Sequence, residues 1–83
     1  MSSPPTDEEL RRLRWQCRRG MLELDEMLLG YLERRYPDAD VAERRAFQRL
    51  LQAQDPELQR WLLLEQRPAD AELCRLVEAI KRG

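Results

Sequence analysis

The chain has 83 residues, 15 basic and 16 acidic side chains, and a formal net charge of −1. A chain of this length forms one small domain that buries about 60–65% of the surface exposed by its unfolded form. The near-neutral charge argues against a strong nucleic-acid binder, which normally presents a net basic face. The sequence contains no histidine, which removes the commonest general base and the usual serine or cysteine triads. No catalytic residue is therefore predicted.

The two cysteines, Cys17 and Cys74, lie far apart and form no CxxC pair. A disulfide framework and a metal site are not expected, and both thiols are predicted to be small buried residues. No run of 18 apolar residues occurs, so we expect no membrane insertion. The polar and acidic residues 1–9 are unlike a signal or transit peptide. These features predict a soluble, cytoplasmic protein.

The first expected element follows a segment, residues 1–5, that is predicted to be disordered. Thr6 is a good N-cap, and Glu9 three residues later completes a capping box. We expect a helix over residues 7–18. Its apolar face would consist of Leu10, Leu13 and Cys17.

Gly20 separates this helix from a second one, expected over residues 21–36. The simplest role for Gly20 is the C′ position of the first helix, where a left-handed conformation is needed. Pro37 ends the second helix. The apolar face of the second helix would consist of Met21, Leu24, Leu28, Tyr31 and Leu32.

Three further helices are expected over residues 41–54, 56–64 and 71–81. Each is preceded by an aspartate that can cap it: Asp40, Asp55 and Asp70. The predicted core residues of these helices are Ala46, Phe47, Leu50, Leu51, Leu58, Trp61, Leu62, Leu73, Leu76, Val77 and Ile80. The predicted fold is all-α, a compact, bundle-like single domain of five helices over residues 6–83.

The segment around Gly20 carries concentrated charge, with Arg18 and Arg19 before the glycine and Glu23 and Asp25 after it. One interpretation is ordinary helix-end chemistry, in which the arginines and acidic residues complement the helix dipoles. The other is a docking site, because glycine allows close approach of a partner backbone and arginine binds carboxylates with a forked geometry.

Trp15 also has two interpretations. It could close the core at the corner between the first two helices, with Met21 resting against it. Alternatively, it could be an exposed side chain that contacts a partner, because tryptophan is enriched at interface hot spots.

Three blocks in this order resemble one family. Arg19-Gly20-x-x-Glu23 resembles the RGxxE signature of the SdhE family, also called YgfY or Sdh5. The second block is Phe47-x-x-Leu50-Leu51 with Asp55-Pro56-Glu57-Leu58-x-x-Trp61-Leu62, and the third is residues 68–73, Pro-Ala-Asp-Ala-Glu-Leu. The resemblance covers residues 10–80. One departure is Gln66, where many relatives have a glycine, which leaves the conformation of that turn open.

The resemblance implies an assembly factor for succinate dehydrogenase and not an enzyme. Such a protein binds the flavoprotein subunit of succinate dehydrogenase, and in bacteria often that of fumarate reductase, and promotes covalent attachment of FAD there. FAD is then the partner's cofactor, and none is expected to bind stably to this chain. The partner-binding residues carried over from the family, with their neighbours, are Trp15, Arg18, Arg19, Gly20, Met21, Glu23 and Asp25.

Two alternative functions remain open on the sequence. The same family resemblance also implies an antitoxin-like protein that neutralises a small membrane toxin. A small DNA-binding module is the other alternative, suggested by the arginines between Arg11 and Arg19 and opposed by the near-neutral net charge.

Overall fold

The computed structural model describes residues 4–82, and within this range it confirms the all-α, five-helix architecture. The helices are α1 (Asp7–Gln16), α2 (Leu22–Arg34), α3 (Val41–Leu50), α4 (Asp55–Leu62) and α5 (Ala71–Arg82), with a 3₁₀ turn, η1 (Tyr36–Asp38), after α2. The segment predicted to be disordered lies mostly outside the described residues, because only its residues 4 and 5 are described. None of the helices in this part of the chain is both long and apolar enough to cross a membrane.

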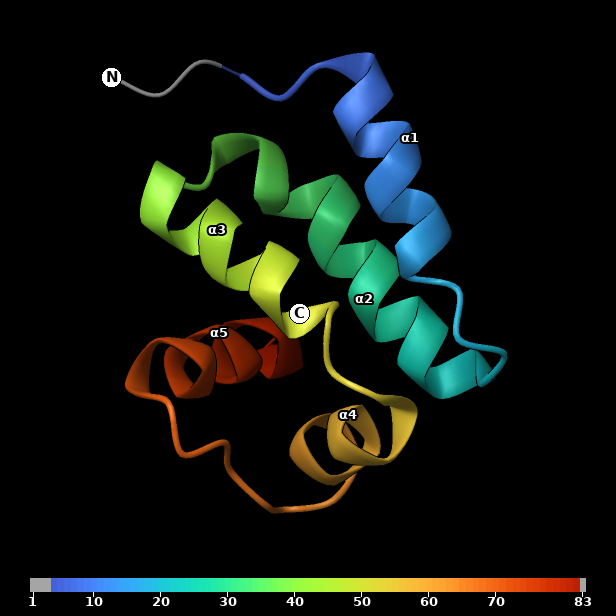
Figure 1. The fold of residues 1–83 in the computed structure, drawn as a ribbon, viewed down its shortest axis with the longest axis vertical. Coiled ribbons are helices and arrows are strands. Elements are labelled where there is room, and N and C mark those ends of the chain that lie inside the picture. The colour runs from blue at the N-terminus through green and yellow to red at the C-terminus, as the bar shows by residue number, and fades with distance from the viewer. Residues whose placement is uncertain (1–3, 83) are drawn as a thin grey trace.

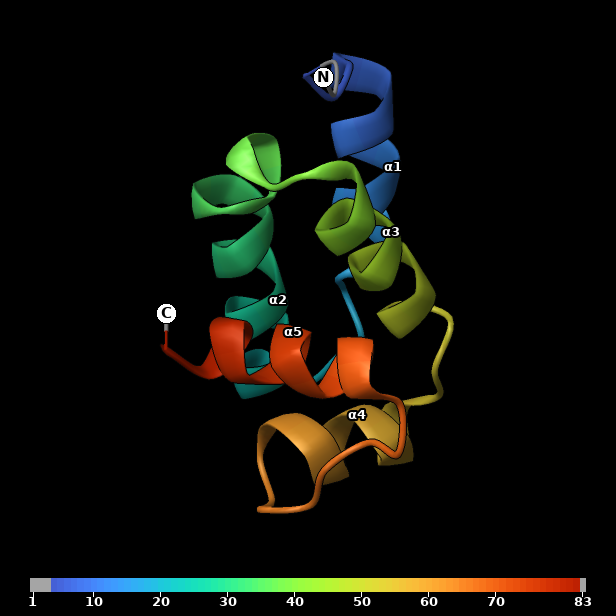
Figure 2. The same ribbon diagram turned by 90° about the vertical axis from the view of Figure 1, so that its left-hand side faces the viewer.

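Helix α5 is at the centre of the packing (Figure 1, Figure 2). It contacts α2, α3 and α4, while α1 packs against α2. Figure 2 shows α5 crossing one end of α2 and α3, and in both views α4 lies on the other side of α5. This arrangement brings the link between α3 and α4 close to the link between α1 and α2.

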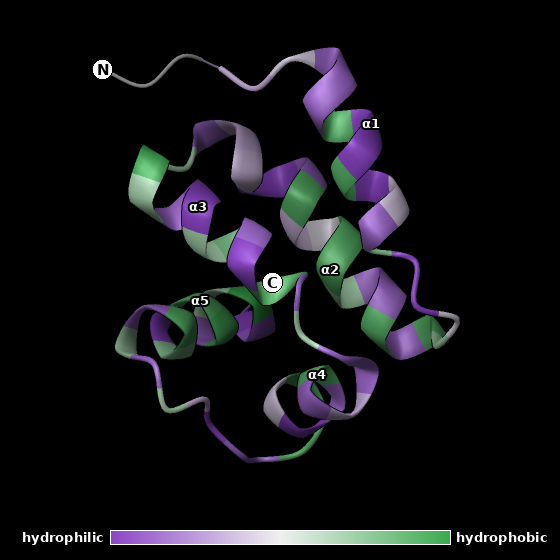
Figure 3. Cartoon of the chain, in the orientation of Figure 1, coloured by the Kyte–Doolittle hydropathy of each residue, from purple (hydrophilic) through white to green (hydrophobic). Residues whose placement is uncertain are grey.

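The core is formed by the apolar face of each helix. Figure 3 shows these apolar residues as stripes on α2 and α5, whereas α1 is mostly hydrophilic. Phe47 lies at the centre, with its ring centroid 4.7 Å from that of Tyr31 and 5.5 Å from that of Tyr36. The Tyr31 hydroxyl donates to Glu43 (2.5 Å) and the Tyr36 hydroxyl donates to Glu9 (2.7 Å). Both buried phenols are therefore paired, as burial of a polar group requires.

Three of the four predicted N-caps are confirmed. Thr6 Oγ1 accepts from the Glu9 amide at 3.1 Å, Asp40 Oδ1 from the Glu43 amide at 2.8 Å, and Asp70 Oδ1 from the Glu72 amide at 2.8 Å. The fourth is wrong by one residue, because Gln54 is the N-cap of α4 and Asp55 is its first residue. The Asp55 carboxylate instead pairs with Arg19.

Four helices, α1 to α4, end earlier than predicted, and α4 ends at Leu62 instead of residue 64. Helix α1 ends at Gln16, and α3 ends at Leu50 because the next residues form tight turns: the amides of Gln52 and Ala53 bond to carbonyls three residues back. The second helix also ends before Tyr36, which belongs to the 3₁₀ turn around Pro37.

The predicted core is largely correct. Cys17 is fully buried. The predicted apolar residues that are only partly buried are Leu10, Met21, Trp61, Leu73 and Cys74. Gln66 causes no strain in the link before α5: within residues 4–82 no residue other than glycine has a positive φ, and the Gln66 amide bonds to the Arg60 carbonyl at 3.2 Å.

Candidate functional site

The link between α1 and α2 consists of residues 17–21, here called the joint. Cys17 is the C-cap of α1, and α2 begins after Met21. Gly20 has a φ of 85°, which confirms the predicted left-handed conformation. The predicted C′ position is wrong, because α1 ends early and Gly20 lies three residues beyond the cap. A Cβ added at Gly20 would meet no atom within 4 Å, so glycine is required here by backbone conformation and not by crowding.

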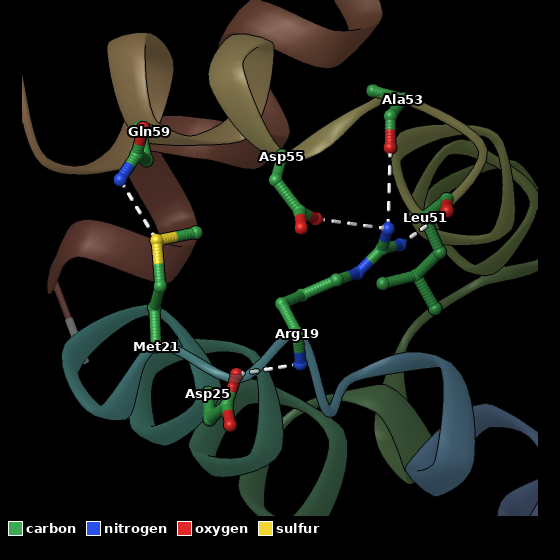
Figure 4. A network of polar contacts seen from close by, with 7 residues as sticks. All are labelled: Arg19, Met21, Asp25, Leu51, Ala53, Asp55 and Gln59. Atoms are coloured by element: carbon green, nitrogen blue, oxygen red, sulfur yellow. Dashed lines mark hydrogen bonds and ion pairs between the residues drawn. The ribbon is translucent and has the colours of Figure 1, made fainter.

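Arg19 turns into the molecule, as Figure 4 shows. Its guanidinium donates to the carbonyls of Leu51 and Ala53 (3.3 Å for Ala53) and pairs with Asp55 at 3.4 Å. Its side chain is only 16% exposed. Its Nε is buried and has no partner among the described residues, so the two terminal nitrogens make these contacts. Arg19 therefore ties the joint to the α3–α4 link.

Asp25 and Met21 also hold the joint from within (Figure 4). Asp25 Oδ1 accepts from the Arg19 amide at 2.8 Å, which fixes the backbone directly before Gly20. Met21 packs against the core, and Gln59 Nε2 lies 2.8 Å from its sulfur. These contacts set the path of the chain into α2.

The surface formed by the joint and the adjoining turns of α1 and α2 carries apolar and charged side chains. Trp15 is 73% exposed, so the interpretation that it closes the core corner is wrong. Leu22 is 74% exposed, and Arg18, Gly20 and Glu23 are exposed as well. Large apolar side chains beside free charges on a surface are typical of protein contact sites.

The seven residues predicted from the sequence therefore divide into two groups. Trp15, Arg18, Gly20 and Glu23 face solvent, whereas Arg19, Met21 and Asp25 make contacts inside the fold. The first group can touch a partner directly. The second group holds the conformation of the α1–α2 link through contacts within the fold.

Sequence reasoning missed two features of the joint. Arg19 contacts the backbone carbonyls of Leu51 and Ala53, which every residue type carries. The contact of Arg19 with the α3–α4 link could therefore not be predicted from residue types. The exposure of Leu22 was not predicted. The available signal was a leucine that lies next to the apolar stripe of α2 but off its face.

Within the joint, the thiol of Cys17 is fully buried. Burial raises the pKa of Cys17 to about 12, and this effect outweighs the opposing effect of Arg19. Within residues 4–82 no cluster of histidine, cysteine and acidic side chains could hold a metal ion.

The chain matches known proteins over most of its length. The family model described as flavinator of succinate dehydrogenase, Sdh5, matches residues 11–83. Among curated relatives, the FAD assembly factor SdhE of Methylococcus capsulatus is 49% identical over 70 residues, which cover 84% of each chain.

Two other relatives carry the same name. The FAD assembly factor SdhE of Pectobacterium atrosepticum is 43% identical over 70 residues, covering 84% of this chain and 80% of the relative. That of Pseudomonas aeruginosa is 39% identical over 74 residues, covering 89% and 88%. The RGxxE residues of the joint lie inside the range that the family model matches. This chain therefore belongs to the Sdh5 family, the flavinators of succinate dehydrogenase.

Proposed function

We propose that this protein is a FAD assembly factor that binds the flavoprotein subunit of succinate dehydrogenase and promotes covalent attachment of FAD to it. The observation that carries the proposal is the match of residues 11–83 to the flavinator family, together with relatives named FAD assembly factors. The joint supplies the contact surface in this proposal. Trp15, Arg18, Gly20 and Glu23 would touch the partner, and Arg19, Met21 and Asp25 would hold these residues in place.

The protein would act as a chaperone without chemistry of its own. The chain has no histidine, and its three glycines form no GxGxxG fingerprint for a dinucleotide. We therefore place FAD, and the residue to which it becomes attached, in the partner. FAD supplies the flavin that becomes bonded there.

Such a chaperone works by differential affinity. It must bind the attachment-ready conformer of the flavoprotein more tightly than the other conformers, because equal affinity for both shifts no equilibrium. A tenfold preference corresponds to about 1.4 kcal/mol. A few contacts at the joint can supply that difference, since a single interface hot spot contributes about 2 kcal/mol.

We extend the proposal to the flavoprotein subunit of fumarate reductase, which the family resemblance implies as a second partner, and to action in the bacterial cytoplasm. The three relatives described above all come from bacteria. A pull-down with each flavoprotein separately would test the second partner.

The test of the main proposal is in-gel flavin fluorescence of the denatured succinate dehydrogenase flavoprotein. The host lacks its own assembly factor and carries either an empty vector, the wild type or Glu23→Ala. Glu23 is exposed, so the variant should fold normally. We expect the wild type to restore covalent flavin and Glu23→Ala to restore much less.

A matched control is Glu65→Ala, which removes an exposed carboxylate in the α4–α5 link, away from the joint. It should behave as the wild type. Equal fluorescence with the empty vector and the wild type would contradict the assembly function. Full activity of Glu23→Ala would contradict the assignment of the joint. Equal amounts of flavoprotein and of each variant must be confirmed by immunoblot.

A further inference from the structure

A surface groove extends along α2 from Glu23 towards the end of α5. It has a volume of about 390 Å³. Glu23 lies at one end, so the groove is continuous with the proposed contact surface. The other residues that line it are Glu26, Met27, Gly30, Tyr31, Arg34, Ile80 and Lys81.

Gly30 is the unusual residue of this groove. It lies inside α2, where glycine is less favourable than alanine because it loses more backbone entropy on folding. Its backbone has no positive φ, so conformation does not require glycine. Nor does packing require it, because a Cβ added there would approach only Arg34 Cζ, at 4.0 Å.

Gly30 therefore weakens α2, although neither the backbone conformation nor the packing of the described residues requires glycine there. Residues 23, 27, 30 and 34 share one face of α2, at the i, i+4, i+7 and i+11 positions. The missing side chain leaves space in the groove on that face, bordered by the guanidinium of Arg34. This is the arrangement expected where the backbone of a partner approaches closely.

The charges of the groove indicate the character of the partner segment. Glu23 and Glu26 lie near the start of α2, and Arg34 and Lys81 lie at the far end. Acidic side chains at the start of a helix and basic ones at the end also complement helix dipoles, so the charges alone do not identify a site. However, none of the four forms an ion pair with another residue in the range 4–82, so all four remain free to pair with a ligand.

We propose that this groove is the continuation of the docking surface and receives a segment of the flavoprotein whose backbone lies over Gly30. The segment carries a basic side chain opposite Glu23 and Glu26 and an acidic side chain opposite Arg34 and Lys81. This inference rests on the proposed function, since it takes the flavoprotein as the partner. It adds Gly30, Glu26, Arg34 and Lys81 to the contact residues.

The test uses variants that fill the groove while favouring the helix. Gly30→Ala and Gly30→Gln both replace glycine by a better helix former, so we expect each to raise the Tm by about 4 °C. Binding to the purified succinate dehydrogenase flavoprotein would be measured by biolayer interferometry. Gly30→Ala should bind at least threefold more weakly than the wild type, because its Cβ takes the space of the approaching backbone, and Gly30→Gln at least tenfold more weakly. Lost binding in a more stable protein cannot result from unfolding.

A second pair of variants tests the charges. Arg34→Glu should weaken binding at least tenfold, whereas Arg45→Glu, the same change at an exposed position of α3 outside the groove, should not. Binding within threefold of the wild type by both Gly30→Gln and Arg34→Glu would contradict the proposal that the groove receives the flavoprotein segment. That outcome, with Glu23→Ala still impaired, would leave the proposed function intact. A wild type that binds no flavoprotein would overturn both proposals.

Discussion

Arg18 and Arg19 are adjacent in the sequence but differ in their exposure to solvent. Arg18 is exposed, whereas the guanidinium of Arg19 contacts Leu51, Ala53 and Asp55 inside the fold. Arg19 therefore holds the joint against the α3–α4 link. The carboxylate that pairs with Arg19 in the structure belongs to Asp55 of the same chain.

Substitution of the two arginines should separate binding from stability. Arg19→Met removes charge-assisted hydrogen bonds, and we expect a loss of about 1.5–3 kcal/mol in the free energy of unfolding. Arg18→Ala should change this free energy by less than about 0.5 kcal/mol, as is usual for surface positions, and should weaken flavoprotein binding. Urea unfolding and a binding assay on the same two proteins would measure both effects. Equal stability of the two variants would contradict the internal role of Arg19.

The buried thiol of Cys17 should make stability depend on pH. Its pKa is raised from 9.0 to about 12 by burial, so the unfolded chain loses the thiol proton first as the pH rises. The stabilising contribution is complete below pH 9 and is lost as the pH rises towards 12. Between pH 8 and pH 10 the free energy of unfolding should fall by about 1.4 kcal/mol from this group.

The control for this effect is Cys17→Ala, which should show a smaller fall between the same two pH values. Urea unfolding at pH 8 and pH 10 gives the comparison. Burial also raises the pKa of Tyr31 and Tyr36. Both tyrosines are present in the wild type and in Cys17→Ala, so they contribute to the pH dependence of both proteins. An identical pH dependence of the two proteins would contradict the raised pKa of the thiol.

At the scale of elements, the α1–α2 joint depends on the backbone of Gly20. Its φ of 85° is a conformation that costs a residue with a Cβ about 1–2 kcal/mol. The space around it is open. Glycine therefore serves two purposes at this position: it allows the turn, and it leaves the surface free of a side chain.

Two substitutions of Gly20 should distinguish these purposes. Gly20→Ala and Gly20→Arg incur the same backbone strain, and each should lower the Tm by roughly 4–16 °C. Only the arginine also places a long side chain on the contact surface, so Gly20→Arg alone should abolish flavoprotein binding. Thermal unfolding followed by circular dichroism and a pull-down would test this. Complete loss of binding with Gly20→Ala would mean that backbone conformation, and not free space, is what the partner requires.

At the scale of the molecule, one core connects all five helices. Phe47 is fully buried between the rings of Tyr31 and Tyr36, which belong to α2 and η1. A domain of 83 residues has a free energy of unfolding of roughly 4–12 kcal/mol. A single large cavity at this position therefore removes much of the stability.

Phe47→Ala should lower the free energy of unfolding by about 3–5 kcal/mol. Val41→Ala, in the same helix but 45% exposed, should lower it by less than about 1 kcal/mol. Guanidinium unfolding monitored by circular dichroism would give both values. Similar losses for the two variants would show that Phe47 is not at the centre of the core.

Helix identity and core membership were predictable from sequence because they depend on local signals. The apolar period of α5 and the aspartate caps at Asp40 and Asp70 were read correctly. Helix ends were less accurate: α3 stops at Leu50, where the chain tightens into a turn, although the residues that follow carry no glycine or proline before Pro56.

The sequence by itself determined the helical fold, the family and the composition of the joint, because periodicity, caps and short motifs are properties of neighbouring residues. Only the tertiary structure decided which joint residues face outward. Arg19 turns inward because the packing of α5 between α3 and α4 brings carbonyls from residues 51 and 53 within its reach. Trp15 stays exposed because Leu13 of α1 and its C-cap Cys17 face the core, whereas Trp15 lies off that face. Such choices depend on contacts more than 30 residues apart, which no local pattern records.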